Sequence, residues 1–147
     1  MKISLVSAHT IDINTLSAIE ESVSGSHLYS PLSRDEWATE LKENNVYLIM
    51  NEARVVGSIE YQMKSPEHAY ISGIVIKKDE QGKGYGRAAI ENLLKIIPSA
   101  RVIDLVTHPE NIAAKKLYES FGFVEKEHME NYFGDGEPRV RLEKSRA

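Results

Sequence analysis

Cysteine is missing from the 147-residue sequence. Disulfide bonds, thiolate metal ligands and a covalent cysteine intermediate are therefore excluded, so any group transfer should be direct. The sequence also lacks a hydrophobic run long enough to span a membrane. The apolar residues 3–6 are followed too soon by His9, Thr10 and Asp12 to form a signal peptide. We therefore expect a cytoplasmic protein that does not act at a membrane.

An overall basic charge is missing as well. The 18 basic and 22 acidic residues give a net charge of −4, so no general positive field favours nucleic acid as a partner. With 41% hydrophobic residues, the chain fits one domain over residues 1–147 with a core of useful size. An anion site would have to be local. A basic excess of this kind lies at 77–87, where Lys77, Lys78, Lys83 and Arg87 outnumber Asp79 and Glu80.

The basic segment contains a glycine-rich turn, Gln81-Gly82-Lys83-Gly84-Tyr85-Gly86, between a predicted strand at 70–76 and a predicted helix at 87–97. Glycine lets the backbone approach a ligand closely, and a helix start directs unpaired N–H groups and positive dipole toward it. Phosphate, and pyrophosphate in particular, is the ligand that this turn suits. A glycine-rich turn without a ligand remains the alternative.

Two familiar phosphate loops fit the spacing poorly. A nucleoside-triphosphate P-loop needs Ser or Thr directly after Gly-Lys, where this chain has Gly84. A dinucleotide fold needs G-x-G-x-x-G directly after its strand, but here the pattern is G-x-G-x-G and five residues separate Ile76 from Gly82. Asp104 lies about twenty residues on, where that fold has a ribose-binding acid, but it falls within a predicted strand.

Periodicity and end signals predict a β-α-α-β-β-β-α-β-α-β-β order. Ser33 and Glu36 predict a capping box at the second helix, and Asn111 predicts the N-cap of the last. Antiparallel hairpins combined with one βαβ crossover indicate an α/β chain with a mixed sheet. The predicted strands are 1–7, 46–50, 55–63, 70–76, 101–107, 123–127 and 139–143, and the predicted helices are 12–23, 33–41, 87–97 and 111–121, the third ending near Pro98 and the fourth stopped by Gly122.

Downstream residues add to the glycine turn. The chain reads Gln81-x-x-Gly84-x-Gly86 after a strand ending Ile74-Val75-Ile76, then Asn111-x-x-Ala114-x-x-x-Tyr118-Glu119-x-x-Gly122-Phe123. This combination resembles motifs A and B of the GNAT N-acetyltransferase superfamily, over about residues 70–124. Segments 33–41 and 131–136 also resemble the branch that acetylates protein N-termini, including those of ribosomal proteins. The resemblance implies a mostly antiparallel sheet of about seven strands with about four helices, splayed between the fourth and fifth strands.

The resemblance implies acetyl-coenzyme A (acetyl-CoA) as co-substrate and a primary amine as acceptor. Main-chain groups of Ile74 and Ile76 would pair with the pantetheine arm like an added strand. The amide of Val75 would stabilise the tetrahedral oxyanion, and Gln81 would shape the loop. The pyrophosphate and the rest of the coenzyme would be held by amides of Gly82, Lys83, Gly84, Tyr85, Gly86 and Arg87, together with Asn111.

Tyr118 is the predicted acid. Thioester cleavage expels a thiolate, whose parent thiol has a pKa near 8.5, and a tyrosine of pKa near 10 can protonate it. The predicted helix 111–121 places Tyr118 on one stripe with Ala114. Without the motif, a core tyrosine is the simpler interpretation of such a stripe. With motif B present, we interpret Tyr118 as catalytic.

The general base is the point at which the chain departs from the pattern. The branch that acetylates protein N-termini has a glutamate five residues before the motif asparagine, and this chain has Val106 there. Strand alternation places Asp104 and His108 on the same face as Val106, and Glu60 lies on the polar face of another strand. We rank His108 first, because it ends its strand next to motif B and its ordinary pKa near 6.5 suits a base. Each candidate is otherwise an ordinary polar strand residue.

The acceptor is not specified by these motifs. An α-amine with a pKa near 8 is neutral in about a tenth of molecules at pH 7 and a lysine amine in fewer than about one in a thousand, so weak base assistance favours the less basic amine. A small amine, such as a polyamine or an amino-sugar, is the alternative acceptor, and an acetyl-CoA sensor without efficient catalysis is the alternative to an enzyme. A homodimer is possible. The loop 24–31 and the final hairpin would set acceptor choice through His27, Tyr29 and Tyr132, and Glu20, Glu21, Asp35 and Glu36 could attract a cation.

Overall fold

The structure, a computed structural model, describes residues 2–97 and 100–146. Its element order matches the predicted one, with two short 3₁₀ turns added. The elements are β1 (Ile3–Ser7), η1 (Thr10–Asp12), α1 (Ile13–Ser22), α2 (Arg34–Glu43), β2 (Asn45–Asn51), β3 (Arg54–Ser65), β4 (His68–Ile76), η2 (Lys78–Glu80), α3 (Tyr85–Ile96), β5 (Val102–Thr107), α4 (Ile112–Ser120), β6 (Val124–Met129) and β7 (Arg139–Ser145).

The seven strands of the described chain form one sheet in the order β1-β2-β3-β4-β5-β7-β6. Neighbouring strands are antiparallel except β4 and β5, which are parallel and joined through α3. The predicted closing hairpin forms, and β7 lies between β6 and β5. The mixed, mostly antiparallel fold expected from the sequence is therefore confirmed.

Local sequence signals place the helix starts. The hydroxyl of Ser33 accepts a hydrogen bond from the Glu36 amide while the Glu36 carboxylate accepts one from the Ser33 amide, which is the predicted capping box. α3 begins at Tyr85, two residues earlier than predicted, because Tyr85 belongs to its buried stripe with Ala89 and Leu93. α3 ends at Ile96, and Pro98, the predicted stop, lies outside the described residues.

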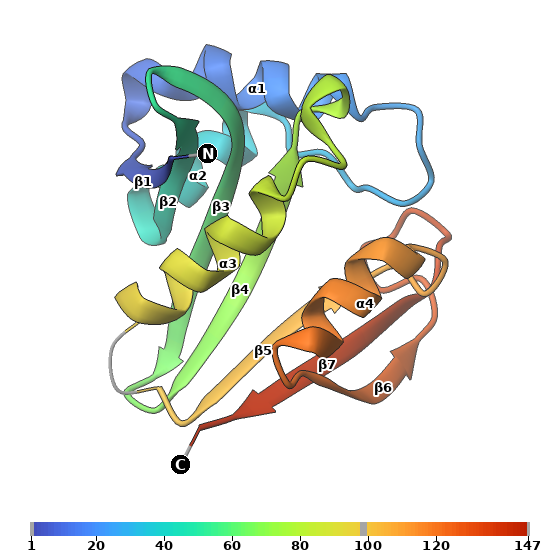
Figure 1. Ribbon diagram of the computed structural model, residues 1–147. Helices are drawn as coiled ribbons and strands as arrows, with labels where there is room; N and C mark the ends of the chain where they lie inside the picture. The colour runs from blue at the N-terminus through green and yellow to red at the C-terminus, as the bar shows by residue number, and fades with distance from the viewer. Residues whose placement is uncertain (1, 98–99, 147) are drawn as a thin grey trace.

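Helices cover both faces of the sheet (Figure 1). α3 and α4 pack over one face, and α1 and α2 pack over the other. Strand β2 shows how alternation serves the two layers: Val46 and Leu48 pack with α1 and α2, whereas Ile49 faces the α3 side. Trp37 of α2 is fully buried in the second layer. None of the helices in the described ranges is both long and apolar enough to cross a membrane.

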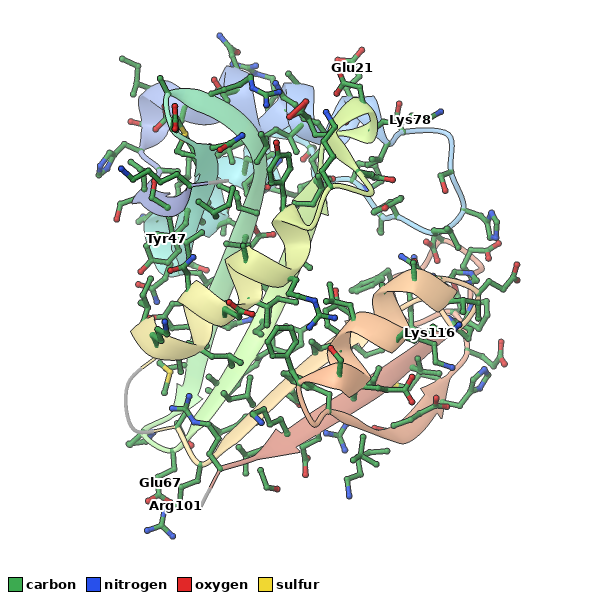
Figure 2. The ribbon with its side chains drawn as sticks, viewed as in Figure 1. Glu21, Tyr47, Glu67, Lys78, Arg101 and Lys116 are labelled. Carbon is green, nitrogen blue, oxygen red and sulfur yellow. The ribbon has the colours of Figure 1, made fainter. Side chains whose placement is uncertain are left out.

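The sheet opens between β4 and β5. These strands pair from His68 with Val102 to Ile71 with Leu105 and no further, after which they diverge (Figure 1). β4 carries an irregularity at the same level, because Gly73 opposes Glu60 on β3 while Ile71 opposes Tyr61. Such a bulge bends a strand locally. At the closed end, Arg101 and Glu67 lie together (Figure 2), with Nε and Oε1 3.3 Å apart.

Candidate active site

A cleft of about 840 Å³ lies where β4 and β5 diverge. Its walls come from α1, α2, the loop 23–33, β3, β4, the glycine turn, the first residues of α3, the end of β5, α4 and the start of β7. The cleft brings together the predicted site residues Glu60, Ile74, Val75, Ile76, Gln81, Gly82, Gly84, Tyr85, Gly86, Arg87, His108, Asn111 and Tyr118. Lys83 does not line it: its Nζ lies 3.3 Å from Glu80 Oε1.

The glycine turn has the shape of an anion cradle. Gly82 and Gly84 have φ angles of 79° and 86°, a region that side chains other than glycine rarely adopt. A Cβ on Gly82 would meet no atom within 4 Å, so the backbone is open on that side. Gly84 is the N-cap of α3, whose first amides have no partner within the helix. The turn therefore fits a pyrophosphate group.

The side chain of Gln81 hydrogen-bonds to two other walls of the cleft. Its Nε2 donates to the carbonyl oxygen of Ile76 at 3.0 Å and to the hydroxyl of Tyr29 at 3.3 Å. The first bond holds the loop against the end of β4, and the second connects it to the loop 23–33. Gln81 thus connects the glycine turn to β4 and to the loop 23–33.

Tyr85 directs its hydroxyl into an interior network. The Tyr85 hydroxyl accepts a hydrogen bond from Asn51 Nδ2 at 3.0 Å, and Arg54 pairs with the carboxylate of Glu80 beside it. The Arg54 bond holds the pKa of Glu80 below its ordinary value. A coenzyme contact from Tyr85 would therefore come from its backbone amide, as at the other positions of the turn.

Asn111, the N-cap of α4, and Tyr118 of α4 both line the cleft. Asn111 Oδ1 accepts a hydrogen bond from the Ala114 amide at 3.3 Å, so the predicted N-cap is confirmed. Tyr118 is 6% exposed and packs against the ring of Phe123, with centroids 6.1 Å apart. Burial, followed by the neighbouring Tyr29, raises the pKa of Tyr118 above its ordinary value. Tyr118 therefore keeps its proton at neutral pH and can only donate it.

Among the described residues, Glu60 is one of three buried carboxyl groups that line the cleft, the others being Glu20 and Glu80. It is 4% exposed, and its Oε2 has no hydrogen-bond partner among the described residues. Its position depends on Gly73 across the bulge, because a Cβ there would lie 2.1 Å from Glu60 Oε1. Burial, then repulsion from Glu20 and Glu40, raises the pKa of Glu60 to about 8. An unpaired carboxyl with a pKa near neutrality is typical of an acid or base in catalysis.

His108, ranked first as base from the sequence, has both ring nitrogens occupied. Its Nδ1 accepts a hydrogen bond from the Glu110 amide at 3.0 Å, and its Nε2 lies 2.7 Å from Glu137 Oε1. Because the backbone amide can only donate, Nε2 must carry the proton and donate it to Glu137. The neutral ring therefore has no lone pair free for a proton from an amine, and the contacts favour Glu60 instead.

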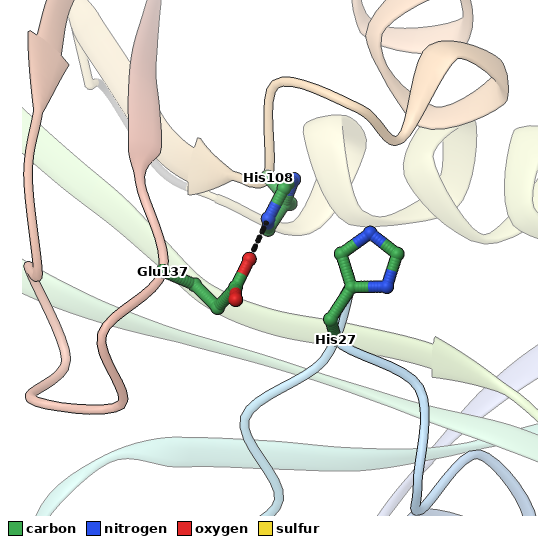
Figure 3. Close-up of side chains that lie close together, drawn as sticks. All are labelled: His27, His108 and Glu137. Atoms are coloured by element: carbon green, nitrogen blue, oxygen red, sulfur yellow. Dashed lines mark hydrogen bonds and ion pairs between the residues drawn. The ribbon is translucent and has the colours of Figure 1, made fainter.

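His108 belongs to a cluster with His27 and Glu137 (Figure 3), whose donor atoms lie within 4.8 Å of one another. A histidine that binds a metal normally donates its other N–H to a second group, whereas here Nδ1 of His108 accepts. Metal on Nε2 would require an imidazolate, so these donors do not fit a metal. The cluster connects the loop 23–33 to the end of β5. The contact of 3.1 Å between His27 Nε2 and Glu110 Oε1 strengthens this connection.

Asp104, the third base candidate, lies outside the cleft lining of the described chain. Its carboxylate is 2.9 Å from His68 Nε2 and 3.4 Å from Arg141. It is one member of an ion-pair network on the sheet, with His68 and Arg141.

Sequence reasoning missed Glu40 altogether. Glu40 lines the cleft from α2 one turn after Glu36, and Glu20 joins them from α1. The available signal was the i, i+4 spacing of Glu36 and Glu40 on one helix face. Glu20, next to Ile19 on an otherwise apolar stripe, gave a second signal, because a carboxylate is rarely buried without a purpose.

Comparison with known proteins gives the family. The acetyltransferase (GNAT) family model matches residues 12–123. An uncharacterized N-acetyltransferase of Methanocaldococcus jannaschii is 27% identical over 106 residues, which are 70% of this chain and 67% of that protein.

Solved structures agree with this assignment. The ribosomal-protein-S18-alanine N-acetyltransferase of Escherichia coli has a TM-score of 0.84 at 23% identity, over 99% of this chain and 96% of that one. A spermidine N-acetyltransferase chimera from Vibrio cholerae and human sequences has a TM-score of 0.81 at 21% identity, over 99% and 96%. The chain thus belongs to the acetyltransferase (GNAT) family and is an acyltransferase that uses acetyl-CoA.

Proposed function

We propose that this protein transfers the acetyl group of acetyl-CoA directly to a primary amine bound beside Glu60. The observation that carries the proposal is the unpaired, buried Oε2 of Glu60 in the cleft wall. Glu60 lies on β3 opposite Gly73 of β4, and β4 has stopped pairing with β5 at this point. Donor and acceptor would therefore meet where β4 separates from β5.

Acetyl-CoA supplies the acetyl group as an activated thioester. Glu60 accepts a proton from the neutral amine as the amine nitrogen bonds to the carbonyl carbon. A backbone amide of β4 that faces the gap donates a hydrogen bond to the oxygen that becomes negative. The Val75 amide, which the resemblance implies for this role, faces β3 instead, because Val75 opposes Ser58 and its carbonyl oxygen lies toward Gly57. Tyr118 protonates the departing sulfur as the carbon–sulfur bond breaks. The products are an N-acetyl amine and free coenzyme thiol, and solvent returns the protons of Glu60 and Tyr118 to their starting positions.

Thiol release measured together with product mass tests this proposal. Incubation with acetyl-CoA and a primary amine should yield one free thiol for each N-acetyl amine. Butylamine, 1,4-diaminobutane and a peptide with N-terminal alanine form a suitable panel. Coenzyme binding without thiol release for any amine would contradict the proposal.

Replacement of Tyr118 by phenylalanine should lower kcat by about 100-fold, within the usual range for a lost general acid. The ring and its packing on Phe123 are kept, so the dissociation constant of acetyl-CoA should stay nearly unchanged. Steady-state kinetics and calorimetric coenzyme binding separate the two effects. Unchanged kcat would remove Tyr118 from the mechanism.

A further inference from the structure

The two ends of the cleft differ in charge. The coenzyme end has the glycine turn, the start of α3 and Arg87. The other end is lined by carboxyl groups from three elements: Glu20 of α1, Glu36 and Glu40 of α2, and Glu60 of β3. We propose that the amine acceptor is a small aliphatic di- or polyamine, whose additional ammonium group binds among Glu20, Glu36 and Glu40. This inference rests on the acetyl transfer proposed above.

Other buried carboxylates of this protein have cationic partners. Glu80 pairs with Arg54 and Lys83, and Asp104 pairs with His68 and Arg141. By contrast, no Lys, Arg or His nitrogen in residues 2–97 and 100–146 comes within 4.0 Å of the four cleft carboxyls. The basic side chains of the cleft wall are Arg87, Arg139, which pairs with Asp135, and Lys116 on α4 (Figure 2).

The partners that these carboxyls do have leave oxygens free. One oxygen of Glu36 accepts the Ser33 amide, and Oε1 of Glu40 accepts from Asn44 Nδ2 at 2.9 Å. Oε2 of Glu40 and Oε2 of Glu60 have no hydrogen-bond partner in the described chain. Glu60 as a residue is only 4% exposed. Buried acceptors without donors are costly, and a ligand that brings N–H donors and positive charge would satisfy both.

Glu20, Glu36, Glu40 and Glu60 line one cleft, so their like charges oppose one another there. Burial, opposed by the Leu32 amide and reinforced by Glu36, raises the pKa of Glu20 to about 7, and Glu20 and Glu40 both act on Glu60. Two ammonium groups would relieve this repulsion and keep the carboxyls ionised. A single ammonium group on the reacting amine would leave the outer carboxyls unpaired.

The shape of the region favours an extended small molecule. The loop 23–33 borders the cleft with residues 28–32 and is attached by the Tyr29–Gln81 and His27–Glu110 contacts. A separate depression of about 330 Å³ shares Leu32, Glu36 and Glu40 with the cleft and is also lined by Asp35 and Thr39. A flexible chain with ammonium groups at intervals can follow this line of carboxylates, whereas a protein N-terminus carries one charge and adjoining peptide groups.

The test compares acceptors that differ in one charge. We expect kcat/KM to be about ten-fold higher or more for 1,4-diaminobutane than for butylamine at low salt, and the ratio to fall as salt rises. Spermidine should match or exceed 1,4-diaminobutane, and both should exceed a peptide with N-terminal alanine.

Variants locate the effect. Glu40→Gln keeps an oxygen that can accept from Asn44. It should lower the ratio of kcat/KM for 1,4-diaminobutane to kcat/KM for butylamine toward one, mainly by raising KM for the diamine. Glu43→Gln removes an equal charge from an exposed position of the same helix and should leave the ratio unchanged. Equal use of both amines, or preference for the peptide, would overturn this inference and leave acetyl transfer standing. No acetylation of any amine would overturn both.

Discussion

Glu60→Gln should lower kcat/KM for amine acetylation by about 100-fold or more, the effect expected when a general base is lost. Glutamine has nearly the same shape, so the space beside Gly73 stays filled and the coenzyme end of the cleft, built from other elements, is unaffected. The dissociation constant of acetyl-CoA should therefore change little. Steady-state kinetics at pH 8, with calorimetric coenzyme binding, measure the two quantities.

His108→Gln is the comparison for this prediction. In the wild type the His108 ring is hydrogen-bonded at both nitrogens. The substitution should therefore lower the stability of the contact between the loop 23–33 and β5 more than it lowers kcat/KM. A larger kcat/KM loss for His108→Gln than for Glu60→Gln, with both proteins folded, would reverse the assignment of the base.

Stability of the ligand-free protein should fall as pH rises from about 5 to 8. The folded-state pKa values of Glu60 and Glu20 are raised from 4.5 to about 8 and about 7. Between pH 4.5 and these values the unfolded chain has released protons that the folded chain still holds, so rising pH favours unfolding. For Glu60, a shift from 4.5 to about 8 at about 1.4 kcal/mol per pKa unit sets an upper bound on the order of 5 kcal/mol for the cost.

Urea unfolding at pH 5.5, 7 and 8.5 measures this effect. The free energy of unfolding should decrease with pH in the wild type, and it should decrease less in Glu60→Gln, which has no proton to lose at this position. Equal pH dependence in the two proteins would contradict a raised pKa for Glu60. Groups with lowered pKa values, such as Asp135 and Glu80, act below this pH window.

The parts of the fold and site that follow from the sequence are those with local signals. The capping box at Ser33 and the cap at Asn111 each involve residues three apart, and both form as predicted. The glycine turn between a strand and a helix is equally local. Together with the downstream motif residues and hydrophobic periodicity, these signals predict the family and the order of the elements along the chain.

The acceptor end depends on contacts between distant segments. The ranking of His108 as base reflects its strand-end position, but Glu137, 29 residues away, occupies one of its nitrogens. Glu60, already a candidate base from the sequence, is favoured over His108 through the bulge opposite Gly73, its burial and repulsion from Glu20 and Glu40. No periodicity of a single helix or strand contains this information, because the carboxyls come from three separate elements.

The pH dependence of kcat/KM for 1,4-diaminobutane, measured in the wild type and in Glu60→Gln, tests the central role of Glu60 most directly. Titration of the amine is common to both proteins, so their ratio isolates Glu60. Since kcat/KM reports groups of the free enzyme, the wild-type to variant ratio should rise with pH as Glu60 loses its proton, then level off above a pH of about 8. A ratio that is constant from pH 6 to about 9 would contradict Glu60 as the base.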